Sequence, residues 1–337
     1  MVDISENNLV ELVRDLRSSS GYIEGETRFL PLDMGGVELK AFLASEKPYD
    51  YVLNLAAMKH VRSEKDEFSL MRMIRTNILE SLDALLMASN SGSKKYFAVS
   101  TDKAKNPANL MGATKKIMED ALLTIGGPTA VSTARFANVA FSDGSLLHGF
   151  NQRISKRQPI AAPNDVKRYF VTGEESGILC LLSTILGRNR EIFFPNLDAG
   201  LHLLTFSEIA ERFITSRGLT PVLVDTEDEA RERVEELAAQ RKWPCYFFAS
   251  DTSGEKAFEE FYSHDDSVDW NRFADIGVID VPDPSDAVRL RVGNFLTIAA
   301  RMRADGHWLK SDLVEAISTA CPELDHVETG RYLDSKM

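Results

Sequence analysis

The first 140 residues alternate between short apolar segments and longer segments with helical spacing, and this alternation constrains the fold more than any other feature. Compact apolar runs stand at residues 51–55, 96–100 and 130–136. Between them, residues 69–88 and 111–123 carry apolar side chains at the spacing of a helix. Two parallel strands need a crossover of a dozen or more residues, usually a helix. The pattern therefore predicts an α/β fold with a doubly wound parallel sheet.

Beyond residue 140 the alternation becomes less regular, which predicts a change of architecture. Apolar spacing predicts helices at 144–157, 174–186 and 207–217, and short strands near 168–172 and 192–195. The charged segment 225–241 is typical of one solvent-facing helix, and 285–320 of two further helices. We expect a sheet domain (1–140), a smaller lobe with returning sheet elements (141–265) and a C-terminal helical appendage (266–337).

The charge balance and the cysteines limit the class of protein. The chain has 39 Lys and Arg against 51 Asp and Glu, a net charge of −12, whereas a nucleic-acid binder needs a basic surface. No apolar run reaches the roughly 18 residues of a membrane span, and no signal peptide opens the sequence. Three widely spaced cysteines fit reduced thiols, and the scattered histidines show no metal spacing. We expect a cytoplasmic protein with no transmembrane segment, metal or nucleic-acid partner.

Small and polar residues gather where the predicted strands end. Ala56 and Ala57 follow one strand, and Ser100–Lys103 lies at the mouth of the next. Ligands of doubly wound sheets bind outside the carboxyl ends of the strands, where small residues let a nucleotide approach the backbone. Lys115 comes one helical turn after Met111 and so shares its face. These segments together predict a ligand site.

With these motifs the chain resembles the extended short-chain dehydrogenase/reductase superfamily. Within it, the chain is most similar to bacterial polysaccharide-biosynthesis dehydratases that act on UDP-N-acetylglucosamine. The resemblance covers roughly residues 2–265 and implies a Rossmann-like sheet and a role in making surface polysaccharide such as capsule or O-antigen. It is carried, in family-like order, by Asp3 with Ser5–Leu9, Ala56–Val61, Ser100–Pro107, Met111–Lys115, Arg135–Val139, Gly144-Ser145, Arg168–Phe170, and Gly254–Lys256 before Phe258–Glu260.

The resemblance implies an NAD cofactor and the residues that hold it. Asp3 would accept hydrogen bonds from the adenosine ribose, and a carboxylate there favours NAD over the 2′-phosphate of NADP. The other implied cofactor contacts, from the adenine to the nicotinamide, are Asp33, Ala56, Ala57, Lys59, Asn77, Ser100, Lys115 and Phe136.

The resemblance also implies which groups bind and transform the sugar. Thr101 would hydrogen-bond the C4 hydroxyl, Asp102 would be the general acid and Lys103 the general base, with Lys115 beside them. A hydride would leave C4 for the cofactor, water would be lost between C5 and C6, and the hydride would return to C6. Arg168 suits the diphosphate, because its guanidinium fork matches phosphate oxygens. The other implied substrate contacts are Lys59, His60, Asn138 and Lys256.

Met111 departs from the superfamily pattern. The superfamily usually has tyrosine there, four residues before the lysine, and a thioether cannot accept a proton. Some dehydratases of the family also carry methionine at this position, and they resemble the subgroup that keeps the C5 configuration. The C4 hydroxyl proton would then leave through Asp102, Lys103 or a water held by Thr101.

The glycine-rich turn that holds dinucleotide phosphates is the second departure. Neither G-x-x-G-x-x-G nor G-x-G-x-x-G occurs in the sequence. The first residues resemble the end of the family's second strand, and without the central first strand the sheet would have two unpaired edges. We expect a sequence truncated at its N-terminus. A rearranged sheet and a degenerate paralogue that no longer binds dinucleotide are the alternatives.

Other functions and plainer structural roles stay open at this point. An epimerase needs no acid–base pair for C5 and C6, so Asp102 and Lys103 favour a dehydratase over an epimerase or reductase on the same fold. A pseudoenzyme that binds a nucleotide or a partner is a further alternative, given Met111 and the missing turn. His60 also fits a structural role, and Asp102-Lys103 an ordinary surface turn. The methionine-rich segment 70–73 fits packing, with a subunit interface as one place for it, rather than a cofactor site. We expect a homo-oligomer that binds a UDP-sugar.

Overall fold

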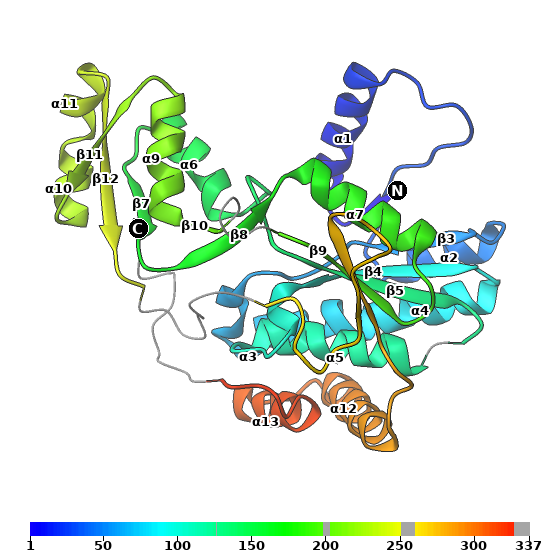
Figure 1. Ribbon diagram of the computed structural model, residues 1–337. Helices are drawn as coiled ribbons and strands as arrows, with labels where there is room; N and C mark the ends of the chain where they lie inside the picture. The colour runs from blue at the N-terminus through cyan, green and yellow to red at the C-terminus, as the bar shows by residue number, and fades with distance from the viewer. Residues whose placement is uncertain (126, 198–202, 251–259, 327–337) are drawn as a thin grey trace.

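The main sheet of the computed structural model has six strands in the order β13-β14-β9-β5-β4-β3 (Figure 1). The structure describes residues 1–125, 127–197, 203–250 and 260–326. Strands β3, β4, β5 and β9 run parallel, and β14 and β13 continue the sheet in antiparallel pairs. The strand bounds are β3 (Tyr51–Asn54), β4 (Lys95–Thr101), β5 (Ala130–Phe136), β9 (Glu191–Pro195), β13 (Val268–Asp269) and β14 (Ile276–Asp280).

Helices cover both faces of this sheet at its central strands, which explains why β4, β5 and β9 are largely apolar. One face carries α3 (Glu67–Ile74), α4 (Glu80–Ser91) and α5 (Leu110–Ile125), and the opposite face carries α7 (Gly173–Leu186) (Figure 1). In β4, Tyr96 and Ala98 pack in the large core beneath α5, whereas Phe97 packs with the α7 side. Successive strand residues point to opposite faces, so a strand buried on both sides is an unbroken apolar run.

The first two strands form a small sheet of their own. β1 (Val2–Asp3) pairs in parallel with β2 (Leu30–Pro31), and α1 (Glu6–Ser19) connects them. A helix α2 (Val37–Ser45) then leads to β3. Among the described residues, β1 pairs only with β2 and β3 only with β4. The predicted doubly wound sheet is therefore present from β3 onward, with the β1–β2 pair separate from it.

A smaller lobe follows β5, at the left of Figure 1. It contains a three-stranded sheet in the order β10-β8-β6 and a parallel sheet in the order β11-β12-β7. Their shared core contains Phe150, Phe213 and Trp243. The bounds are β6 (Asn138–Val139), α6 (Leu146–Ser155), β7 (Ile160–Pro163), β8 (Lys167–Val171), β10 (Leu203–Thr205), α9 (Phe206–Ser216), β11 (Thr220–Val224), α10 (Glu227–Glu232), α11 (Val234–Ala239) and β12 (Lys242–Phe248).

Two predicted helices differ from the observed ones. The single helix predicted over 225–241 is wrong, because the segment forms α10 and α11 with a break at Arg233. The break lets Ala230, Val234 and Leu237 turn inward while the charged residues stay outside. The helix predicted over 69–88 is interrupted by a π-helical turn at Arg75–Leu79, a distortion that is frequent at functional sites.

The two predicted C-terminal helices are confirmed, as α12 (Asp286–Asp305) and α13 (Lys310–Ala320). They lie against α5 on the side away from the sheet (Figure 1) and bring Phe295, Leu313 and Ile317 into the large core. Trp308 Nε1 donates a hydrogen bond to the carbonyl of Glu67, 3.1 Å away. No helix in the described ranges is both long and apolar enough to span a bilayer.

The contact between β14 and β9 requires a glycine, which gives a test of the sheet order. A Cβ at Gly277 would lie 2.3 Å from Cζ of Phe194. We expect Gly277→Ala to lower the free energy of unfolding by about 1–3 kcal/mol, as overpacking does. Gly293→Ala in α12, where nothing lies within 4 Å of the new Cβ, should instead stabilise by about 0.5–1 kcal/mol. Urea unfolding of both variants measures this, and equal stabilities would contradict the packing.

Candidate active site

Three adjacent residues at the mouth of β4 form one hydrogen-bonded unit. The Asp102 carboxylate is buried, and its Oδ1 accepts hydrogen bonds from the Thr101 hydroxyl at 2.8 Å and from the Lys103 backbone N–H at 2.9 Å. Lys103 Nζ lies 3.0 Å from the same oxygen, with its side chain 20% exposed. The turn is a short 3₁₀ helix, Asp102–Ala104, capped by Thr101. A carboxyl, an amine and a hydroxyl are thus held together, with the amine reaching toward solvent.

The N-terminus of α5 lies directly against this turn. A Cβ on Gly112 would lie 2.3 Å from the Lys103 carbonyl oxygen, so only glycine permits this approach. Asn109 Oδ1 accepts the Gly112 N–H at 2.8 Å, and Glu64 Oε1 accepts the Met111 N–H at 2.6 Å. The buried Glu64 comes from the 3₁₀ helix Val61–Glu64 that follows the β3 loop. A carboxylate at a helix N-terminus suits the helix dipole, so Glu64 anchors α5 at position 111.

Lys115 lies one turn farther into α5 and is almost fully buried. Its Nζ donates to the Val99 carbonyl, 2.9 Å away, and lies 3.7 Å from Met118 Sδ. Burial lowers the pKa of Lys115 from 10.5 to about 8, against the opposing effect of Glu119. Met111, in the same helical turn, is also buried. Lys115 therefore links α5 to the end of β4, through the carbonyl of the residue before Ser100.

A buried ion pair between α5 and β5 contacts the same end of β4. Arg135 on β5 binds Glu119 of α5 through two hydrogen bonds of 3.0 and 2.7 Å, and Ser100 donates to the same carboxylate at 2.6 Å. Arg135 Nη1 also donates to the Phe261 carbonyl at 2.6 Å. The sequence analysis gave Glu119 no role. Its place one turn after Lys115 was the available signal, because it predicts a carboxylate on the sheet-facing side of the helix.

Two asparagines shape the loop that follows β3. Asn54 Oδ1 accepts the Ala56 N–H at 3.1 Å. Asn77, in the π-helical turn, clamps the Met58 backbone through both its amide oxygen and its amide nitrogen, and it also donates to Thr114 Oγ1 at 3.0 Å. Asn77 was predicted to contact the cofactor. The structure places it fully buried behind the loop that carries Ala56 and Ala57.

The continuation of this loop contacts the smaller lobe. Lys59 Nζ donates to the Asp143 carbonyl at 2.7 Å, and Gly144 lies so close to His60 that a Cβ there would be 2.9 Å from Nε2. Partial burial lowers the pKa of Lys59, although Asp143 opposes the effect. Burial and then the charge of Lys59 lower the pKa of His60. These contacts bring the strand mouths and the loop before α6 to one place.

The predicted residues near the N-terminus lie at the ends of β1 and β2. Asp3 Oδ1 accepts the Ser5 N–H at 2.7 Å, and Asp33 accepts the Gly35 N–H at 3.1 Å. Arg75 Nη2 donates to the other Asp33 oxygen at 3.1 Å. Asp33 is therefore tied to the π-helical turn that contains Asn77.

The predicted substrate residues lie on neighbouring strands of the smaller lobe. Asn138 on β6 donates to the Tyr169 carbonyl of β8 at 3.3 Å, and the buried Arg168 precedes Tyr169. Phe136 is buried in the core on the α7 side. Lys256 lies outside the described residues. The structure thus gathers Thr101, Asp102 and Lys103 at one strand mouth and places Lys59 and His60 beside the lobe.

A doubly wound sheet with polar residues at its strand mouths and a second lobe defines a class of α/β proteins whose ligands bind at the carboxyl ends of the strands. The chain belongs to the family of polysaccharide biosynthesis proteins, which matches residues 1–280. The fold class predicted from the sequence and its resemblance to this family are both confirmed.

Individual relatives match parts of the chain. An uncharacterized membrane protein of Methanocaldococcus jannaschii is 32% identical over 208 residues, which cover 59% of this chain and 59% of that protein. A UDP-N-acetylglucosamine 4,6-dehydratase (inverting) of Campylobacter jejuni is 35% identical over 158 residues, 44% of this chain and 46% of that enzyme. The chain thus spans about half the length of these curated relatives. The structure of Pen from Bacillus thuringiensis superposes with a TM-score of 0.65 at 23% identity, covering 85% of this chain and 79% of that one.

The buried Lys115 predicts a specific pH dependence of stability. Its pKa is about 8 in the folded chain against an ordinary 10.5, so between these values the unfolded chain holds a proton that the folded chain has lost. Stability should therefore rise with pH across this window, by roughly 1–3 kcal/mol relative to Lys115→Met. Urea unfolding at pH 8 and pH 10 measures the difference.

The neighbouring Lys116 supplies the control for this measurement. Burial acts to lower its pKa, but Asp120 and Glu119 outweigh burial and raise it. Relative to Lys116→Met, the chain should show no gain in stability between pH 8 and pH 10. An equal gain relative to both variants would contradict the assignment to Lys115.

Proposed function

We propose that this protein is a nucleotide-sugar 4,6-dehydratase that converts UDP-N-acetylglucosamine into a UDP-4-keto-6-deoxy-hexosamine for surface polysaccharide synthesis. The observation that carries the proposal is the Thr101–Asp102–Lys103 unit at the mouth of β4, with Lys115 behind it. Dehydration across C5 and C6 needs both an acid and a base, and these residues supply one of each. The relative from Campylobacter jejuni, named for this reaction, supports the substrate class.

An NAD cofactor fits the two ends of this site. Asp3 and Asp33 provide carboxylates for the adenosine end, and Ala56, Ala57 and Ser100 provide small residues along the strand mouths. The sequence contains no glycine-rich turn for the phosphates, so the residues present account for the ends of the dinucleotide and not for its centre. When bound, NAD would supply the acceptor for the hydride from C4 and the donor of the hydride to C6.

Thr101 and Asp102 move one proton from the C4 hydroxyl to the leaving hydroxyl. The Thr101 hydroxyl donates to Asp102 at 2.8 Å and can accept a hydrogen bond from the sugar C4 hydroxyl in the same geometry. As C4 is oxidised to a ketone, its hydroxyl proton passes through Thr101 to the Asp102 carboxylate. Asp102 then gives this proton to the C6 hydroxyl as the C6–O bond breaks and water leaves. Met111 needs no acid–base role in this series of proton transfers.

Lys103 acts as the base at C5 in its uncharged form. The C4 ketone acidifies the C5 proton, which Lys103 removes while the C5–C6 double bond forms. When hydride adds to C6, Lys103 returns a proton to C5 and is again neutral. Its side chain is partly exposed, so the proton exchanges with solvent between the two steps. Asp102 and Lys103 therefore each end in the state in which they began.

In this proposal the substrate is held by four residues, Asn138, Arg168, Lys59 and His60. Arg168 would bind the diphosphate and Asn138 the nucleotide, because both lie on paired strands of the lobe that faces the loop of Lys59 and His60. We further propose the boundaries 1–140 for the cofactor-binding domain, 141–265 for the substrate lobe and 266–337 for the appendage. β9 and α7 of the second range and β13 and β14 of the third return to the main sheet.

Incubation with UDP-N-acetylglucosamine and NAD in deuterated water tests the reaction and the role of Lys103. The expected product carries a C4 ketone, a C6 methyl group and deuterium at C5, all visible by NMR. We expect Lys103→Ala to lose both product formation and C5 exchange, by at least about 100-fold, as expected for a general base. Lys105→Ala, whose lysine pairs with Asp266 at 3.1 Å, is the matched control and should turn over normally. Normal C5 exchange in Lys103→Ala would exclude Lys103 as the base, and a product epimerised at C4 that keeps its C6 hydroxyl would contradict dehydration.

The role of Asp3 predicts a change in cofactor preference. We expect Asp3→Ala to weaken NAD binding several-fold and to reduce discrimination against NADP, because the carboxylate no longer binds the ribose or repels the 2′-phosphate. Calorimetric titration of both dinucleotides measures this. Ser5→Ala is the control, because it removes the N-cap of α1 and leaves the carboxylate in place. Equal changes in the two variants would assign the effect to the helix cap.

A further inference from the structure

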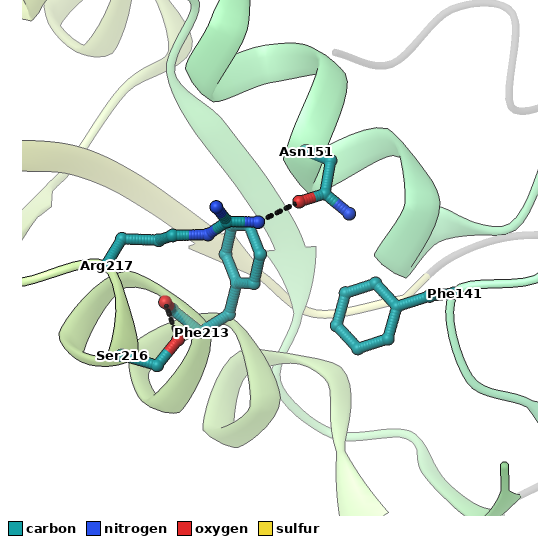
Figure 2. A pocket seen from close by; sticks show the side chains of 5 residues that line it. All are labelled: Phe141, Asn151, Phe213, Ser216 and Arg217. Carbon is teal, nitrogen blue, oxygen red and sulfur yellow. Dashed lines mark hydrogen bonds between the residues drawn. The ribbon is translucent and has the colours of Figure 1, made fainter. Parts of the chain in front are cut away.

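The smaller lobe carries an open pocket of about 450 Å³, lined by Phe141, Asn151, Phe213, Ser216 and Arg217 (Figure 2). This volume lies in the range of small-molecule sites. Asn151 comes from α6, Phe213 and Ser216 come from α9, and Phe141 comes from the loop before α6. These elements belong to the core of the smaller lobe, apart from the mouth of β4. None of the five residues has a part in the proposed reaction.

Phe141 is an exposed aromatic residue in a costly backbone conformation. Its φ is +58°, a region that a bulky side chain rarely adopts, and the residue is 42% exposed. Its ring lies 5.9 Å from that of Phe213, in a tilted arrangement. Strain of this kind persists where the surrounding structure enforces it, often in ligand sites. The conformation presents an aromatic surface to the pocket.

Arg217 supplies a cation beside this aromatic surface. Its guanidinium lies over the Phe213 ring at 5.3 Å, and Nη2 donates to Asn151 Oδ1 at 2.6 Å (Figure 2). Stacking and this hydrogen bond fix the plane of the Arg217 guanidinium. The guanidinium has five N–H donors in all, and the hydrogen bond to Asn151 uses one of them. A Cβ on Gly218 would lie 3.3 Å from Nη2 of Arg241, so a second guanidinium reaches the residue next to Arg217. A second cationic side chain thus lies beside the C-terminal end of α9.

We propose that this pocket binds a nucleoside phosphate, with the base against Phe141 and the phosphate at Arg217. A ring held on an aromatic face gains stacking energy, and an oriented guanidinium binds phosphate oxygens through paired hydrogen bonds. Asn151 and Ser216 add an amide and a hydroxyl at the rim. The proposal does not depend on the proposed dehydratase activity, since it uses none of its residues.

The position of Phe141 couples this pocket to the candidate active site. Phe141 lies three residues after Asn138 and two before Asp143, whose carbonyl accepts the Lys59 hydrogen bond. The loop between them is closed by hydrogen bonds from Ser142 N–H to the Val139 carbonyl and from Ala140 N–H to the Val171 carbonyl. A nucleotide that holds Phe141 would therefore also stabilise the loop that contacts Lys59. By linkage, a ligand at either site would then strengthen binding at the other.

Ligand-observed NMR and calorimetric titration with UMP and AMP test the pocket. We expect both nucleotides to bind. In Asn138→Ala, which removes the proposed substrate contact, Arg217→Gln and Phe141→Ala should each weaken UMP binding at least tenfold. Arg212→Gln is the matched control, because Arg212 is an exposed arginine on the same helix, outside the pocket lining and roughly 140° around the axis. Inorganic phosphate and uridine separate the two halves of the ligand, and each should bind more weakly than UMP. Circular dichroism of each variant establishes that it is folded.

An Asn138→Ala variant separates this pocket from the proposed substrate site. UMP binding that persists in Asn138→Ala and is lost when Arg217→Gln is added to that variant supports the pocket. Loss of all UMP binding in folded Asn138→Ala, or binding in Asn138→Ala that adding Arg217→Gln leaves unchanged, overturns the proposal. Absence of UMP and AMP binding to the unaltered chain also overturns it.

Discussion

The close approach of α5 to the turn after β4 is the contact on which the candidate site depends. Gly112 allows the helix to touch the Lys103 carbonyl, and no larger residue would fit. This contact fixes where Thr101, Asp102 and Lys103 stand relative to Met111 and Lys115. The helix is buried from both sides, by the sheet and by α12 and α13, so it cannot easily shift. The C-terminal helices therefore support the site although they lie on the far side of α5.

Buried charges near the site are balanced by direct partners. Glu119, Arg135 and Lys115 are all nearly inaccessible to solvent, and removing such charges from water costs several kcal/mol each unless hydrogen bonds replace the lost hydration. Glu119 and Arg135 satisfy each other and also hold Ser100 and the Phe261 carbonyl. An ion pair in this position adds little net stability, but it permits few alternative arrangements of the strand ends. Orientation of the acid and the base is what such rigidity provides.

Much of the fold was predictable from the sequence because both faces of the central strands of the main sheet are buried. β4 and β5 are therefore long apolar runs, and the helices beside them show the usual spacing. The strands of the β11-β12-β7 sheet were missed. β11 and β12 contain Pro221 and Pro244, and β7 ends at Pro163, so these strands lack the signal of a buried run. The break at Arg233 was missed because charge alone does not show where a helix ends. Family motifs located the residues at the mouth of β4, whereas Glu64 and Glu119 act through tertiary contacts that a linear pattern does not show.

The separate β1–β2 pair has a consequence for the behaviour of the protein in solution. β3 lies at the border of the six-stranded sheet with Tyr51 49% and Leu53 39% exposed, and its backbone groups along that border have no partner strand among the described residues. An unpaired edge strand of this kind can bind another extended peptide, because its free N–H and C=O groups can form the hydrogen bonds of an added strand. The four residues of β3 are therefore where we expect edge-to-edge contact between molecules to form.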